Sequence, residues 1–133
     1  MSTTAQSQPI APPGAGQSLT VLAVDDDALV LMSTSAMIEE LGHAVIEAAS
    51  ARQALEILRD GASVDLVITD QAMPDMTGVE LAQALNREWP NLPVVLATGY
   101  SDLPPGSPPF PMIGKPFSEK DLERTIADAL ARR

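Results

Sequence analysis

Acidic side chains follow two short apolar runs of the sequence. Asp25 and Asp26 come directly after the run 19–24, and Asp70 comes directly after the run 65–69. Two carboxylates about 4 Å apart repel each other by several kcal/mol near a protein surface. A fold that gathers these acids therefore needs a cation, and oxygen ligands without His or Cys favour Mg²⁺. Because Mg²⁺ also binds substrate phosphates, this pattern indicates phosphoryl chemistry.

A hydroxyl and an ammonium group end two further apolar segments. Thr98 closes the run 92–98, and Lys115 precedes Pro116 at the end of the segment 111–116. Taken singly, each residue has an ordinary interpretation, because acids and hydroxyls are common in turns and lysines are common on surfaces. The position of all of them at the ends of predicted strands instead favours one shared pocket.

The elements that must position these residues alternate between strand and helix patterns. Short apolar runs predict buried strands, whereas apolar residues at helical spacing before a glycine predict helices. The predicted strands span 19–24, 43–49, 65–69, 92–98 and 111–116, and the predicted helices span 28–41, 50–59, 78–88 and 118–131. This order predicts an α/β fold, a doubly wound five-stranded parallel sheet with helices on both faces. In such sheets the ligand site lies outside the carboxyl ends of the strands.

The first predicted helix and the strand after it carry further expectations. Asp27 is interpreted as the N-cap of the helix, because its carboxylate can accept hydrogen bonds from backbone N–H groups. His43 is interpreted as a solvent-exposed residue at the start of the second strand, and the methionines as residues that fill the core. The apolar residues at helical spacing in this helix are Leu29, Met32, Ala36, Met37 and Leu41.

The segment between Thr98 and Lys115 is rich in proline. Each proline in a helix interior costs about 3 kcal/mol, because it removes an N–H donor and clashes with the preceding turn. We therefore expect no helix of two turns there, and instead a Pro-rich loop that contacts partners. The prolines are Pro104, Pro105, Pro108, Pro109 and Pro111.

The composition narrows the possible functions. A net charge of −10 disfavours binding to nucleic acid or to an anionic membrane surface. The absence of cysteine excludes disulfides and a thiol nucleophile. No apolar run approaches the ~18 residues of a membrane helix, and residues 1–17 lack the basic start and apolar core that are typical of a signal peptide. We expect one cytoplasmic domain, 18–133, after a disordered tail, 1–17, whose Ser, Thr, Gln, Pro, Ala and Gly residues cannot build a core.

From about Leu19 to Leu130 the sequence resembles the receiver domain of two-component response regulators, which has a CheY-like, flavodoxin-like fold. The matching motifs, in order, are VDD ending at Asp26, Asp70 followed by MPDMTG, Thr98, and KPF starting at Lys115. The stretches VLATGY and GKPFS are most similar to receivers that are attached to, or work with, hybrid sensor kinases. The resemblance therefore implies either a single-domain receiver or one of the hybrid-kinase type.

The resemblance implies a role for each matching position. Asp70 would accept the phosphoryl group, which Thr98 and Lys115 would contact, and the bond before Pro116 would be cis. The implied Mg²⁺ ligands are Asp25, Asp26, Asp70 and the backbone carbonyl of Ala72. The implied switch residues are Thr98, Tyr100 and Met112.

The sequence departs from the family pattern in two places. Met112 stands where the family usually has an aromatic residue, and Tyr100 can replace that residue in the switch. The fourth helix of the usual receiver is expected to be missing or replaced by the Pro-rich loop. Because that helix belongs to a common dimerisation face, we expect a monomer.

The implied function is signalling rather than metabolic catalysis. A histidine kinase or hybrid kinase would donate the phosphoryl group, and a downstream protein or phosphotransferase would receive the signal. Two alternatives remain open at this point. One is a Mg²⁺-dependent aspartyl-phosphate phosphatase, although such an enzyme would carry an Asp-x-Asp pattern followed by Thr or Val after its first strand, where this sequence has Asp-Asp-Asp-Ala. The other is a receiver-like module that binds partners without being phosphorylated.

Overall fold

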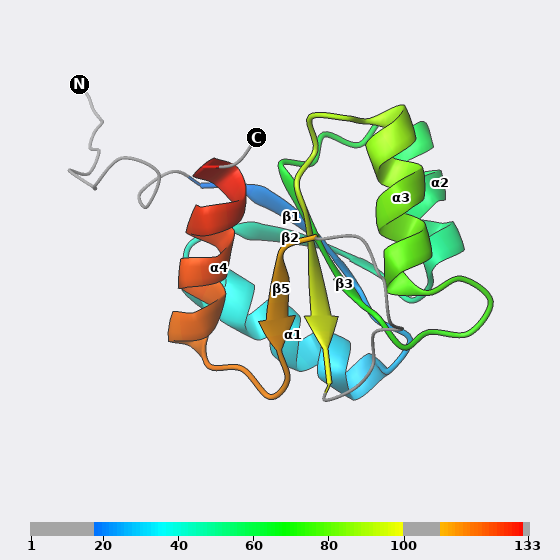
Figure 1. Cartoon of the computed structure of the whole chain (residues 1–133). Helices are drawn as coiled ribbons and strands as arrows, with labels where there is room; N and C mark the ends of the chain where they lie inside the picture. Colours follow the sequence, from blue (N-terminus) through cyan, green and yellow to red (C-terminus); the bar gives the residue numbers. More distant parts are fainter. Residues whose placement is uncertain (1–17, 100–109, 132–133) are drawn as a thin grey trace, which may run out of the picture.

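The computed structural model describes residues 18–99 and 110–131 of the chain. In this part of the chain, strands and helices alternate along the sequence (Figure 1). The elements are β1 (Thr20–Val24), α1 (Ala28–Glu40), β2 (Ala44–Ala48), α2 (Ala51–Arg59), β3 (Leu66–Asp70), α3 (Gly78–Glu88), β4 (Val94–Thr98), β5 (Met112–Gly114) and α4 (Glu119–Ala131). All strand pairs are parallel and the strand order is β2-β1-β3-β4-β5. The predicted five-stranded parallel α/β fold is confirmed.

Two of the sequence-based expectations concern residues that are not described. The predicted disordered tail is 1–17, and the predicted Pro-rich loop in place of a fourth receiver helix falls largely on 100–109. Both segments lie outside the described residues. The helices that are described are the four named above, and none of them is long and apolar enough to cross a membrane.

Helices cover both faces of the sheet. Leu22 and Val24 of β1 pack in a core cluster with α2 and α3, whereas Val21 and Ala23 pack in a second cluster with α1 and α4. Figure 1 shows the same division, with α2 and α3 on one side of the sheet and α1 and α4 on the other. Because successive side chains of a strand point to opposite faces, a strand covered on both sides reads as the continuous apolar run seen in the sequence.

The starts of the helices are fixed by side-chain caps. The Asp27 carboxylate accepts hydrogen bonds from the backbone N–H groups of Leu29 and Val30, at 3.0 and 3.2 Å, so its predicted N-cap role is confirmed. At α3, the Thr77 hydroxyl accepts from the Glu80 N–H while the Glu80 carboxylate accepts from the Thr77 N–H, which forms a capping box.

The buried face of α1 follows the apolar spacing of its sequence only in part. Met37 and Leu41 are partly buried and pack against the second core cluster, as that spacing predicts. Leu29 and Met32 are 76% and 64% exposed. The stripe that faces the sheet has i, i+3, i+4, i+7 spacing and consists of Leu31, Thr34, Ser35 and Ile38. The Ser35 hydroxyl is satisfied by donating to the Glu47 carboxylate of β2 at 2.6 Å. A small polar side chain with a partner on a neighbouring strand can therefore lie on the buried face of a helix.

Two minor interpretations are also wrong. The methionines do not all fill the core, since Met32 on α1 and Met112 on β5 are exposed, although Met73 is buried. His43 is not a freely exposed residue. It is half-buried, and its Nδ1 accepts a hydrogen bond of 3.1 Å from the backbone N–H of Leu19. The imidazole thus links the turn after α1 to the start of β1.

Candidate functional site

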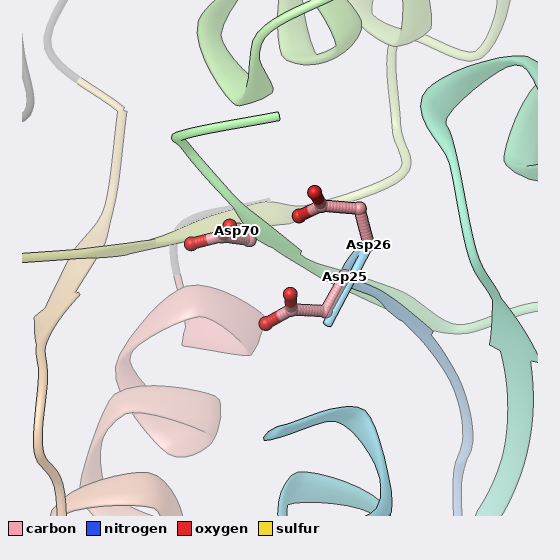
Figure 2. Close-up of side chains that lie close together, drawn as sticks. All are labelled: Asp25, Asp26 and Asp70. Atoms are coloured by element: carbon pink, nitrogen blue, oxygen red, sulfur yellow. The ribbon is translucent and has the colours of Figure 1, made fainter. Parts of the chain in front are cut away.

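Three carboxylates meet at the carboxyl ends of two neighbouring strands. Asp25 and Asp26 follow β1, and Asp70 is the last residue of β3, which pairs with β1. One carboxylate oxygen from each lies within 4.8 Å of the others. Figure 2 shows the three carboxyl groups pointing to the same side. From β1 the chain adds β2 on one side and the remaining strands on the other side. Open α/β sheets place their ligands at this change of direction.

The three acids differ in exposure. Asp25 and Asp70 are each only 6% exposed, whereas Asp26 lies on the surface. Burial raises the pKa of Asp25, and the Asp70 charge raises it further. The backbone N–H of Asp27, which donates to Asp25 Oδ1 at 2.9 Å, opposes this rise, as does the charge of Lys115. The site therefore presents two acids with little access to solvent and one acid at its mouth.

Lys115 is the cation that two of these acids, Asp70 and Asp25, contact. Its Nζ lies 2.5 Å from Asp70 Oδ1 and 3.6 Å from Asp25 Oδ2. Burial lowers the pKa of Lys115, but the hydrogen bond and charge of Asp70, with a smaller contribution from Asp25, outweigh burial and raise it. The lysine is therefore held in its charged form beside Asp70.

Backbone contacts bring Lys115 to this position. Its N–H donates to the carbonyl of Thr98 at 2.8 Å, which extends the pairing of β4 with β5, and the Lys115–Pro116 peptide bond is cis. Thr98 is half-buried and pairs with Gly114. Thr98 therefore ends its strand one residue pair before Lys115, at the same end of the sheet.

The donor set fits a hard divalent cation. The three acids supply only oxygen atoms as ligands. The single ammonium group of Lys115 does not balance all three carboxylates, so an excess of negative charge remains in a partly buried place. Mg²⁺ binds through a small number of carboxylates and completes its coordination with water and phosphate oxygens. Of the described residues, this is the group of acids close enough together to hold a metal ion.

The segment after Asp70 packs closely against the end of β3. A Cβ atom at Gly78 would lie 2.5 Å from the Asp70 carbonyl oxygen, so this approach requires glycine. The Gly78 N–H donates to the Gln71 carbonyl at 3.0 Å. The side chain of Gln71 is buried, and its Oε1 accepts from the Val79 N–H at 2.8 Å. We did not predict a role for Gln71, although an amide directly after a buried apolar strand is a signal of a specific polar contact.

The remaining predicted site residues are less closely connected to the acids. Ala72 is exposed in the loop after Asp70. Met112 begins β5 and is 51% exposed, and it pairs with Leu96 at the strand end away from Lys115. No described contact joins Met112 to the carboxylates, and Tyr100 lies outside the described residues.

Comparisons with known proteins agree with this geometry. Residues 21–107 match the response regulator receiver domain. The chain is 34% identical over 122 residues to the sensor kinase CckA of Brucella abortus (strain 2308), a match that covers 87% of this chain and 13% of that protein. It is 31% identical over 121 residues to the transcriptional regulatory protein ZraR of Klebsiella oxytoca, with 87% and 27% coverage. The chain thus spans about a quarter or less of the length of these two relatives.

Solved structures show the same fold. The crystal structure of FIXJ-N has a TM-score of 0.76 and 32% sequence identity, and the match covers 88% of this chain and 97% of that one. A receiver domain protein from Clostridium thermocellum has a TM-score of 0.77 and 27% identity, with coverage of 86% and 95%. From its strand order, its acid cluster with Lys115, and the match over residues 21–107, this chain belongs to the response regulator receiver family.

Proposed function

We propose that Asp70 is the phosphoryl acceptor of a two-component phosphorelay, and that it takes the phosphoryl group from a histidine kinase or hybrid kinase in the presence of Mg²⁺. The observation that carries this proposal is the environment of Asp70, whose carboxylate lies close to those of Asp25 and Asp26 and contacts the ammonium of Lys115. A carboxylate is a weak nucleophile, but phosphoryl transfer depends mainly on positioning and charge neutralisation. The site supplies both.

In the proposed step, an Asp70 carboxylate oxygen attacks the phosphorus of a phosphohistidine. The new O–P bond forms as the P–N bond breaks, and the imidazole leaves and takes up a proton. Lys115, already paired with Asp70, is in place to contact an oxygen of the incoming group. The Thr98 hydroxyl, from the end of β4, is proposed to donate a second hydrogen bond to that group.

The proposed metal ligands are the three carboxylates and the backbone carbonyl of Ala72. When bound, Mg²⁺ supplies neutralisation of the charge on the phosphoryl oxygens and on the acids. Asp26 is exposed, whereas Asp25 and Asp70 are buried. Asp26 would therefore be the metal ligand at the mouth of the site, and the two buried acids would be the inner ligands.

The first turn of α1 is proposed to receive the kinase. It begins directly after the acids and exposes Leu29, and the next turn exposes Met32. Next to it, a groove of about 350 Å³ separates α1 from Lys115–Phe117 and is lined partly by Val30, Met37 and Phe117. Because the phosphoryl donor must reach Asp70, a helix of the histidine kinase that presents its phosphohistidine would pack here. The acidic charge of the chain favours a donor surface that is basic.

A single experiment tests the proposed function and separates it from its alternatives. The chain is incubated with Mg²⁺ and acetyl phosphate, beside the variant Asp70→Asn. Hydroxylamine-sensitive phosphate on the parent, absent from Asp70→Asn, supports a receiver. Continuous release of inorganic phosphate without a labelled protein indicates a phosphatase, and neither product indicates a module that binds without phosphorylation. Either of the last two results contradicts the proposal.

A further inference from the structure

The loop between Asp70 and α3 is held by one buried residue, Gln71. Its side chain and backbone together make four hydrogen bonds. The backbone N–H donates to the Ala97 carbonyl at 3.1 Å, and the carbonyl accepts from Met73 at 3.1 Å and from Gly78 at 3.0 Å. The side-chain Oε1 accepts from the Val79 N–H at 2.8 Å. Gln71 is only 4% exposed, so these bonds are shielded from competing water.

These bonds surround the residue expected to supply a backbone ligand. Ala72 lies between Gln71 and Met73, and the Met73 N–H donates back to the Gln71 carbonyl. The direction of the Ala72 carbonyl is therefore set by the short turn that Gln71 closes. The same residue follows Asp70 directly and ties the end of β3 to β4 through Ala97. A shift of Gln71 would displace both the acceptor carboxylate and the Ala72 carbonyl.

The side-chain bond from Gln71 to Val79 joins residues further apart in sequence than the Thr77 cap of the same helix does. The first N–H groups of a helix have no partners within the helix. Thr77 satisfies the N–H of Glu80 from three residues away and is a local cap. Gln71 satisfies the N–H of Val79 from eight residues away, and its bond is buried. Thr77 therefore stabilises the helix start, whereas Gln71 connects the helix start to the acceptor strand.

We propose that Gln71 is a positioning residue for the phosphoryl-acceptor site, which holds Asp70 and the Ala72 carbonyl in the arrangement that binds Mg²⁺. This inference rests on the proposed function. Groups that orient metal ligands commonly change metal affinity by about 10- to 100-fold when removed. The inference predicts that the Gln71 amide affects Mg²⁺ affinity more than it affects the stability of the fold.

The test compares Gln71→Met with Thr77→Ala. Methionine is unbranched and close in size to glutamine, but it offers the Val79 N–H no comparable acceptor. Thr77→Ala removes the other cap of α3 and leaves the Gln71 bonds in place. The measurements are the Mg²⁺ dissociation constant by calorimetry, the unfolding transition in urea, and the exchange rate of the Val79 amide.

We expect a dissociation constant about tenfold higher for Gln71→Met, with a faster-exchanging Val79 amide. For Thr77→Ala we expect lower stability and a dissociation constant within about twofold of the parent.

The outcomes separate this inference from the proposed function. Equal Mg²⁺ affinity in Gln71→Met and the parent overturns the positioning role. An equal loss of Mg²⁺ affinity in Gln71→Met and Thr77→Ala also overturns it. A parent chain that binds no Mg²⁺ overturns the proposed function and this inference with it. If Gln71→Met does not fold, the exchange rate of the Val79 amide in the parent, measured with and without Mg²⁺, decides the question. Val79 exchange that slows on adding Mg²⁺ supports the link between loop and site, and unchanged exchange contradicts it.

Discussion

The Nζ atom of Lys115 lies 2.5 Å from Oδ1 of Asp70. The two residues are 45 positions apart in sequence, and they meet because the ends of β3 and β5 lie on the same edge of the sheet. Their pair holds Lys115 charged, with a raised pKa. Under the proposed function, an incoming phosphoryl group would share or replace this contact, so we propose Lys115 as the sensor of phosphorylation.

Replacing Lys115 by alanine should separate phosphate acceptance from the response to it. Lys115→Ala is expected to form the acyl phosphate about a hundredfold more slowly, because one preorganised charge on the reacting group is lost. The amide exchange pattern of the phosphorylated variant should resemble that of the unphosphorylated protein. Rates of labelling by acetyl phosphate and exchange mass spectrometry measure the two effects. A variant that responds to phosphorylation like the parent would contradict the sensor role.

Asp26 can be tested against its neighbour Asp27. Asp26→Asn should weaken Mg²⁺ binding by about tenfold or more, because affinity depends on the number of charged ligands. Asp27→Asn removes the same charge one residue away and keeps the N-cap, since asparagine caps a helix as well as aspartate. We expect Asp27→Asn to change the affinity by less than about threefold. Comparable losses of Mg²⁺ affinity in Asp26→Asn and Asp27→Asn, measured by calorimetry, would mean that the affinity depends only on the overall negative charge of this region.

The sequence predicted the site better than it predicted some of the packing. Asp25, Asp70 and Lys115 could be placed together because strand ends in a parallel α/β sheet share one edge. The polar part of the buried face of α1 could not be predicted, because Ser35 is satisfied by Glu47, a partner that only the tertiary fold supplies. The same reason hid the contact of His43 with Leu19 and that of Gln71 with Val79. Local patterns identify elements and their ends, whereas polar contacts between elements depend on the assembled structure.

Gly78 should not tolerate a side chain. In Gly78→Ala, the new Cβ would lie 2.5 Å from the Asp70 carbonyl oxygen and 2.9 Å from Gln71 Cα, both backbone atoms that cannot rotate away. We expect the free energy of unfolding to fall by about 1–3 kcal/mol, together with slower phosphorylation of Asp70. Gly114→Ala is the matched control, since a Cβ there meets no atom within 4 Å. Equal stability of the two variants in urea would exclude a steric role for Gly78.

The exposed start of α1 should matter for transfer from a kinase but not for small donors. Leu29→Ser is expected to slow transfer from a purified histidine kinase that phosphorylates the parent by about tenfold, which is typical of losing one apolar anchor of an interface. Labelling by acetyl phosphate should stay unchanged, because this donor needs no docking surface. Ala36→Ser makes a comparable polar change at an exposed position about two turns further along the helix. If both variants slow kinase transfer equally, the kinase does not dock at the first turn.

His43 should make the stability of the fold depend on pH. Burial lowers the pKa of His43 below its ordinary value of 6.5, although the charge of Glu123 on α4 opposes this. Between the lowered folded pKa and 6.5, the unfolded chain binds more protons than the folded one, so the free energy of unfolding rises with pH. The neutral ring is also the form whose Nδ1 can accept the Leu19 N–H.

The chain has one histidine, so the variant His43→Gln removes this titration completely. Urea unfolding measured from about pH 5 to about pH 7.5 should show the parent losing stability, relative to His43→Gln, as the pH falls through 6.5. The comparison with the variant cancels the carboxylates, including Asp25, whose raised pKa acts in the opposite direction. Parallel stability curves for the two proteins over this range would show that the bond between His43 and Leu19 does not depend on the protonation of the ring.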